Sequence, residues 1–224
     1  MYIGRIMHRD LITVHPETSI AEAERLVKKK GIDHLPVVNS SNKLVGVISD
    51  RDIKSYSASP ATTLSVHELT YLLEKLEVSE LMSSPVITVP PETTIERAAY
   101  VMVEKHISSL PVVDGETLAG IITRTDVLKF LLRTIGLGED SARMEIFVRD
   151  GIGQLARICS IFRDADINIM SLISCPEPEY KGITQLVLRV NKNDEEKALA
   201  TLREKGIKAK GKYVTDITPW LPEE

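Results

Sequence analysis

Apolar and polar positions in the first half of the chain follow one order. A short apolar run at 12–14 reads as a strand, and apolar residues at the spacing of an amphipathic helix follow over 20–31, where a glycine ends the pattern. The segments 36–38 and 44–48, separated by a polar turn, read as the two strands of a hairpin. A second helix is predicted after Ser49. This order is a β-α-β-β-α unit.

The same order of elements occurs a second time along the chain. Residues 7–38 overlay residues 82–113 without a gap, and the identical segments include Pro-Glu-Thr at 16–18 and 91–93 and Leu-Pro-Val-Val at 35–38 and 110–113. After the loss of one residue, Asp52 matches Asp126. One unit is too small to bury its own helices and sheet, so we expect the two to pack together as a single domain.

The repeated motifs resemble the CBS repeat. Each unit opens with I-T-V-x-P-x-T, carries L-P-V-V in its middle and has G-[VI]-I-[ST]-x-x-D near its end. The resemblance covers residues 1–135 as a CBS pair, or Bateman module. Within it, repeat one spans about 1–57, an inserted helix about 60–77, and repeat two about 78–135.

The resemblance implies an adenosyl nucleotide (AMP, ADP, ATP or S-adenosylmethionine) bound between the repeats. A carboxylate can accept hydrogen bonds from a ribose diol, and hydroxyls and free N–H groups at a helix start suit a phosphate. The nucleotide-binding candidates are Thr123, Arg124, Thr125 and Asp126 from repeat two, and His34, Ser49, Arg51, Asp52 and Ser109 from repeat one and its facing edge. The repeat-two motif ranks first, because acidic residues surround the repeat-one motif.

A purely structural role competes for the same residues. Ser49 and Thr123 each precede a carboxylate by three positions, which is close to a capping box, and such a cap stabilises a helix by about 1 kcal/mol without any ligand. His34 has the alternative of an ordinary solvated residue before a strand. The spacing alone leaves both roles open.

The remainder of the chain shows a different pattern. The insert at 60–77 reads as a helix with a narrow apolar face, which packs on its own domain or on another subunit. Its residue pattern, T-T-L-S-V-H-E-L-x-Y-L-L, resembles that of the acetoin-utilisation CBS proteins. A linker is expected at 136–142. Strands at 144–148, 167–174, 183–190 and 207–215 with helices at 154–164 and 194–205 then predict a ferredoxin-like β-α-β-β-α-β sandwich over 143–216, followed by a tail at 217–224.

This second pattern resembles an ACT domain through D-G-I-G-Q-L-A at 150–156 and A-D-I-N-I at 165–169. The resemblance implies an amino-acid effector contacted by Asp150, Gly153 and Asn168. An isoleucine replaces the usual proline before Gly153, and Asp150 would repel a carboxylate. A plain dimerisation domain therefore remains the alternative.

Composition narrows the functional classes. The formal net charge is −4 without a basic stripe, so no nucleic-acid partner is expected, and no apolar run reaches the ~20 residues of a membrane span. The two cysteines, Cys159 and Cys175, are expected to be buried thiols in a reducing, cytoplasmic compartment. The five histidines have no metal-ligand spacing, and no catalytic constellation or catalytic cofactor is predicted.

The fold class expected is therefore α+β, with a CBS pair and a ferredoxin-like ACT domain. The function expected is a non-catalytic sensor of an adenosyl nucleotide that acts as a homodimer on an unknown protein target, with a link to acetoin or acetate metabolism resting on resemblance. A single sandwich leaves one sheet face and an edge strand uncovered, which favours the homodimer. The alternative is a dimeric scaffold that binds no small molecule.

Overall fold

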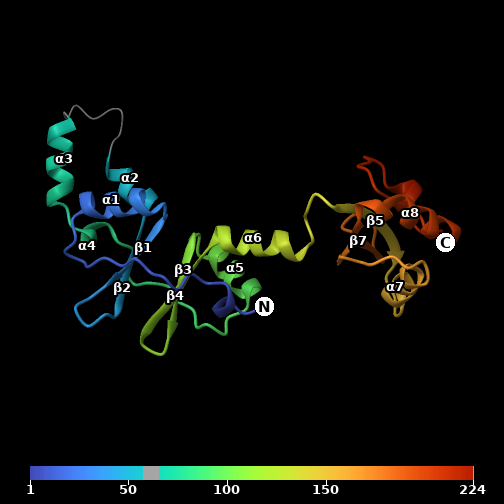
Figure 1. The fold of residues 1–224 in the computed structure, drawn as a ribbon, viewed down its shortest axis with the longest axis horizontal. Helices are drawn as coiled ribbons and strands as arrows, with labels where there is room; N and C mark the ends of the chain where they lie inside the picture. The colour runs from blue at the N-terminus through green and yellow to red at the C-terminus, as the bar shows by residue number, and fades with distance from the viewer. Residues whose placement is uncertain (58–65, 224) are drawn as a thin grey trace. The chain divides into compact units, whose positions relative to one another are not determined.

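The computed structural model describes residues 1–57 and 66–223 (Figure 1). The chain forms two compact units, Met1–Leu128 and Lys129–Glu224, each with its own apolar core. The helix α6 (Arg124–Thr134) runs across the division between them. Of the expected insert 60–77, residues 58–65 lie outside the described residues.

The first unit contains the helix–hairpin–helix order predicted for each repeat (Figure 1). Its elements are the 3-10 helix η1 (Ile3–Arg5), α1 (Ile20–Lys30), β1 (His34–Val38), β2 (Leu44–Ser49), α2 (Asp50–Ser57), α3 (Val66–Lys75), α4 (Val78–Leu81), α5 (Ile95–Glu104), β3 (Ser109–Asp114), β4 (Thr117–Thr123) and the start of α6. The Ser19 hydroxyl caps the start of α1, and Gly31 ends it at a φ of 62°.

The prediction of an opening strand at 12–14 is wrong. This segment makes a single parallel bridge, in which Val14 N donates to Pro36 O and Val38 N donates to Val14 O. Pro36 and Pro16 carry no N–H, so the ladder cannot continue in either direction. The His15 side chain reaches the Val38 carbonyl instead, with 3.0 Å between Nδ1 and the oxygen. In repeat two, Val89 forms the equivalent single bridge to Val112.

Each repeat donates its opening segment to the other repeat. Ile3 N and Gly4 N donate to the carbonyls of Thr93 and Pro91, and His8 exchanges two backbone hydrogen bonds with Ile121. In the opposite direction, Val78 N and Ser79 N donate to the carbonyls of Thr18 and Pro16, and Val47 and Ser83 exchange another pair of hydrogen bonds. The two repeats are thus joined into one domain through main-chain pairing as well as packing.

The second unit is an antiparallel four-stranded sheet with helices on one face. Its elements are β5 (Ser141–Arg149), α7 (Gln154–Asp164), β6 (Ser171–Pro176), β7 (Ile183–Asn191), the 3-10 helix η2 (Lys192–Asp194), α8 (Glu195–Glu204), β8 (Ala209–Lys210) and η3 (Thr218–Trp220). The strand order β6-β7-β5-β8 and the β-α-β-β-α-β succession confirm the predicted sandwich. Alternate residues of β5 and β7, including Met144, Ile146 and Leu188, are wholly buried against α7 and α8.

Two strand boundaries differ from the prediction. The strand expected from 167 begins at Ser171, because Asp166 adopts a φ of 54° and Ile167 turns into the core. The strand expected over 207–215 is reduced to Ala209–Lys210, and it ends at Gly211, where an added Cβ would lie 2.9 Å from Glu195 Oε1. Such a close approach marks the point where the chain leaves the sheet.

Part of the sheet face opposite the helices is already covered. Phe147 is 4% exposed, and the pair formed by Glu145 and Lys210 is buried, with Arg143 as a second partner of the carboxylate. Burial acts to raise the pKa of Glu145, but hydrogen bonds from Lys210 and Arg143 outweigh it and hold that pKa below its usual value. The sequence analysis expected this face of the sheet to be uncovered, but the side chains of Glu145, Phe147 and Lys210 on it are buried.

The cysteines differ from the expectation of two buried thiols. Cys159 is exposed on α7 and Cys175 is half-buried on β6. No helix in the described ranges is both long and apolar enough to span a bilayer. Among the described side chains, no group of three or more His, Cys, Asp or Glu residues is arranged to hold a metal ion.

Candidate functional site

The two repeated hydroxyl–carboxylate motifs have the same local geometry. Each lies where a strand passes directly into a helix, Ser49 at the end of β2 and Thr123 at the end of β4. In both, one carboxylate oxygen accepts from the backbone N–H at 2.8 Å and from the hydroxyl at 2.6 Å, while the carboxylate residue's own N–H donates to that hydroxyl at 3.2 Å. The capping box expected for Ser49 with Asp52 and for Thr123 with Asp126 is thus observed.

The starts of both helices are also tied to the hairpins. Asp50 N donates to Asp33 O and Arg124 N donates to Ser108 O, each at 2.8 Å. These bonds hold the first turns of α2 and α6 beside the first residues of β1 and β3. The Arg124 guanidinium donates to the Ile107 carbonyl at 2.9 Å, which fixes this cation near the same point.

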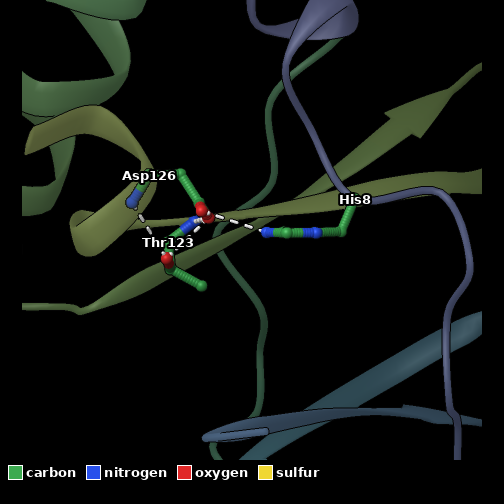
Figure 2. Close-up of polar contacts among 3 residues, drawn as sticks. All are labelled: His8, Thr123 and Asp126. Atoms are coloured by element: carbon green, nitrogen blue, oxygen red, sulfur yellow. Dashed lines mark hydrogen bonds and ion pairs between the residues drawn. The ribbon is translucent and has the colours of Figure 1, made fainter. Parts of the chain in front are cut away.

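The second oxygen of each carboxylate distinguishes the two motifs. Figure 2 shows the His8 ring directed at the carboxylate of Asp126, with 3.0 Å between Nε2 and Oδ1. No described side chain or backbone group bonds to Oδ1 of Asp52. The repeat places Ser83 where repeat two has His8, and Ser83 is too short to replace the imidazole. Asp52 therefore keeps one carboxylate oxygen without a described partner, whereas both oxygens of Asp126 are engaged.

The contacts of Asp126 keep it ionised. Burial acts to raise the pKa of this carboxyl, but hydrogen bonds from the hydroxyl and backbone of Thr123 and from His8, with the charge of His8, outweigh it and lower the pKa. A carboxylate with both oxygens engaged acts as a structural anion that joins the opening segment to α6.

A cavity of about 500 Å³ lies between the two repeats. It is lined by Asp33, His34, Val47, Ser49, Asp50, Arg51, Asp52, Ser83, Pro85, Val86, Ile87, His106, Ile107, Ser108, Ser109, Pro111, Thr123, Arg124 and Thr125. Eight of the nine nucleotide-binding candidates from the sequence are among these residues. Asp126, the leading candidate carboxylate, is not, because its side chain faces Thr123 and His8.

His34 spans the cavity from repeat one to repeat two. Its Nε2 lies 2.8 Å from the hydroxyl of Ser108, and its Nδ1 is buried without a hydrogen-bond partner among the described residues. Burial lowers the pKa of this imidazole more than the nearby Asp33 and Asp52 raise it. A neutral His34 thus connects the two repeats through Nε2 and leaves a buried, unsatisfied nitrogen on its other side.

Acidic crowding at the repeat-one motif is smaller than the sequence suggests. Asp50 forms an i,i+4 ion pair with Lys54, whose pKa is raised, chiefly by its hydrogen bond to that carboxylate. Arg51 also lines the cavity. Two cations thus accompany the carboxylates of this motif.

Sequence reasoning missed the segment that forms one wall of the cavity. Ser83, Pro85, Val86 and Ile87 belong in sequence to repeat two but line the cavity beside β2 of repeat one. The available signal was the repeat itself, since Ser83 aligns with His8. What it did not reveal was that the opening segments are exchanged.

The three effector candidates of the second unit lie on its surface. Asp150 and Asn168 are exposed, and Gly153 occupies the N-cap position of α7 with a φ of 89°. None of the three lines the interrepeat cavity or the cavity of the second unit described below. The amino-acid effector stays a prediction.

Comparison with known families matches two regions of the chain. The CBS domain model matches residues 3–59 and 78–133, together just over half of the 224 residues, and the ACT domain model matches residues 142–206. The CBS matches fall on the two repeats, and the ACT match falls on the sandwich.

Curated relatives share the first region. The homoserine O-acetyltransferase of Methanohalobium evestigatum is 34% identical over 131 residues, 58% of this chain, but the chain spans only 24% of that enzyme's length. An uncharacterized protein of Methanocaldococcus jannaschii is 34% identical over 155 residues, which cover 59% of this chain and 92% of that protein. The similarity to the enzyme is thus a similarity over about a quarter of its length.

Solved structures resemble the same region. The CBS-pair protein CBSX2 from Arabidopsis thaliana is 33% identical, with a TM-score of 0.50, over 59% of this chain and 94% of that one. A protein assigned to acetoin utilization from Vibrio cholerae is 26% identical, with a TM-score of 0.49, over 59% of this chain and 91% of that one. Two repeats with the CBS pattern, joined as a pair and followed by the sandwich, leave one assignment: the chain belongs to the CBS domain family and carries two CBS domains and an ACT domain.

Proposed function

We propose that the chain is a non-catalytic regulatory protein that binds an adenosyl nucleotide (AMP, ADP, ATP or S-adenosylmethionine) in the cavity between its CBS repeats. The observation that carries the proposal is the free Oδ1 of Asp52 inside a cavity whose opposite side is rich in hydroxyls. A volume of about 500 Å³ is within the ~300–1,000 Å³ of ligand pockets.

Asp52 is the proposed partner of the ribose. Its Oδ2 is held by Ser49, so the carboxylate has a fixed orientation before the ligand arrives, and Oδ1 can accept from the diol. Val86, Ile87 and Pro111 provide apolar wall for the base. This assignment replaces the ranking from sequence, which put the carboxylate of Asp126 first.

The start of α6 is the proposed site of the phosphate. Ser108, Thr123 and Thr125 line this side with hydroxyls, and Arg124 adds a positive charge. The helix has eleven residues, and the positive end of its dipole favours an anion at its start. One ligand would therefore use the carboxylate of repeat one and the hydroxyls of repeat two.

The nucleotide signal is further proposed to pass to the ACT domain within a cytoplasmic homodimer. The continuous helix α6 begins at the cavity, and the carbonyl of Ile135 just after its end accepts from the Ser171 hydroxyl of β6 at 2.6 Å. Exposed apolar residues on α5 and α6, among them Tyr100, Val103 and Leu128, offer a surface that a second copy would cover. The same surface favours the alternative of a scaffold without a nucleotide, and the link to acetoin metabolism rests on resemblance.

Isothermal titration with AMP, ADP, ATP and S-adenosylmethionine tests the site. Loss of a charged hydrogen-bond acceptor costs about 1.5–3 kcal/mol, so Asp52→Asn should weaken binding about tenfold or more. Asp126→Asn is the matched control, because it alters the same motif outside the cavity, and it should change the affinity much less. Equal losses, or a larger loss at Asp126, would contradict the assignment. Absence of binding heat with all four nucleotides would favour the scaffold.

A further inference from the structure

A second cavity, of about 270 Å³, lies within the ACT unit. It is enclosed by the end of β5, the first turns of α7, the turn between α8 and β8, and the segment after β8 that contains Trp220 and Glu223. This position differs from that of Asp150, Gly153 and Asn168, none of which lines it. The cavity is also smaller than the interrepeat cavity, so it suits a molecule smaller than a nucleotide.

Positive charge dominates the polar part of this cavity. Three cations, Arg149, Arg157 and Lys208, line it together with one described carboxylate, that of Glu223. The Lys208 ammonium lies 3.3 Å from Glu223 Oε1 and donates to the Leu221 carbonyl, also at 3.3 Å. Arg149 donates to the Glu223 carbonyl at 3.3 Å. The C-terminal segment thus supplies acceptors for two of the cations.

Arg157 has no such acceptor. No hydrogen bond or ion pair joins its guanidinium to any described residue, although it lies on the first turns of α7 beside the cavity. The carboxylate of Glu223 balances one positive charge, which leaves a net excess of two among the described lining residues. Such an excess beside a cavity favours a small anion.

The other walls of the cavity are apolar. Ile158 is wholly buried, Phe147 and Ile207 are 4% and 9% exposed, and Trp220 and Pro222 close the side formed by the C-terminal segment. Inorganic phosphate would leave these walls in contact with water, whereas a carboxylic acid with a hydrocarbon body would cover them and gain from burial.

We propose that this cavity binds a small organic carboxylate whose apolar body lies between Phe147 and Trp220 and whose carboxylate pairs with Arg157 and Lys208. The ligand carboxylate takes the place of the Glu223 side chain on Lys208, so the C-terminal segment acts as a weak internal competitor. The ACT domain would then carry a second ligand site, separate from the nucleotide site.

Trp220 is the only tryptophan of the chain, so its fluorescence reports on this cavity alone. Titration of the full chain with phenylacetate should change the Trp220 emission along a saturable curve. Phenylacetamide, which has the same body without the charge, and inorganic phosphate, which has charge without the body, should produce little change. An equal response to phosphate would replace the proposal with a general anion site. No saturable response to phenylacetate well above roughly 1 mM would overturn it.

Three variants sharpen the test. Arg157→Ala should weaken phenylacetate binding about tenfold, whereas Arg163→Ala, on the same helix but paired with Asp164 outside the cavity, should leave it unchanged. Glu223→Gln should tighten binding, because it removes the competing carboxylate. Equal effects of the two arginine variants would overturn the assignment. The phenylacetate titration needs no nucleotide, and Asp52→Asn should leave the phenylacetate affinity unaltered. Failure of this proposal is therefore separate from failure of nucleotide binding.

Discussion

His8 and His34 both belong to repeat one in sequence but meet different surroundings. His8 is largely exposed and pairs with the ionised Asp126. The ring of His34 is partly buried between Ser108 and the cavity, and its Nδ1 is left without a partner among the described residues. The pKa of His34 is lowered because burial, which disfavours the imidazolium, outweighs the attraction of Asp33 and Asp52.

This lowered pKa predicts a dependence of stability on pH. Below the ordinary histidine pKa of about 6.5, the unfolded chain binds a proton at residue 34 that the folded chain resists. The free energy of unfolding should therefore be unaffected by this group above about pH 6.5. It should fall as the pH drops below that value toward the folded-state pKa of His34. Urea unfolding at a series of pH values measures this trend.

The matched variant for this prediction is His34→Gln, which keeps a hydrogen-bonding group near Ser108 but cannot titrate. Its stability should decline less than that of the wild type as the pH falls from about 7.5 to about 5.5, a window above the range where ordinary carboxyls titrate. Parallel declines in the two proteins would show that His34 is not the group responsible.

At the scale of elements, two glycines allow the exchange of opening segments. Gly46 in β2 faces the side chain of Met82, and Gly120 in β4 faces Met7. These glycines align in the repeat, as do the methionines. A Cβ at Gly120 would lie 2.6 Å from Met7 Sδ and 2.8 Å from the backbone oxygen of His8. Glycine in a strand interior here marks a close approach of another segment.

Gly120→Ala should therefore destabilise the CBS pair. The methionine can adjust but the His8 backbone is fixed by two hydrogen bonds to Ile121, so we expect a cost of about 1–3 kcal/mol. Gly46→Ala should cost less, because the nearest atoms are all in the flexible Met82 side chain. Gly138→Ala, with open space around it, is the neutral control for chemical denaturation. Equal costs at Gly46 and Gly138 with none at Gly120 would contradict the exchange.

At the scale of the whole molecule, two units with separate cores are connected by α6. Its first turn lies at the proposed phosphate site, and the residue after its end bonds to β6 of the ACT domain. A ligand that changes the position or order of this helix would affect both units. Coupling between sites requires a ligand to bind two arrangements with different affinity, typically by about 1–3 kcal/mol.

Hydrogen exchange with and without AMP measures that coupling. Protection should rise around Ser49 and Thr123 and should change in the segment from Asp150 to Asn168, and Asp52→Asn should abolish both effects at the same AMP concentration. A change confined to the CBS pair would mean that the nucleotide binds without transmission to the ACT domain.

Light scattering over a dilution series tests the proposed homodimer. A monomer at micromolar concentration would contradict it.

The local elements and the duplication could be predicted from residue order alone. The helical spacing, the caps at Ser19 and Gly31 and the hairpin turns all lie within a few residues of one another, so their physics is local. The candidate site was found for the same reason, since eight of nine predicted residues line the cavity once the repeats face each other. Prolines at 16 and 36 were visible too, but their effect on the opening strand depended on which partner that segment has.

Which of the two carboxylates has an oxygen without a described partner depends on contacts between distant segments. Asp52 and Asp126 have the same local motif, and the difference arises because the exchanged segments bring Ser83 near one repeat and His8 to the carboxylate of the other. The same holds for the charged cavity of the ACT domain, which joins Arg149, Arg157 and Lys208 to a C-terminal segment that carries no repeat or motif. Contacts between segments far apart in sequence are fixed by packing and main-chain pairing, and residue spacing does not encode them.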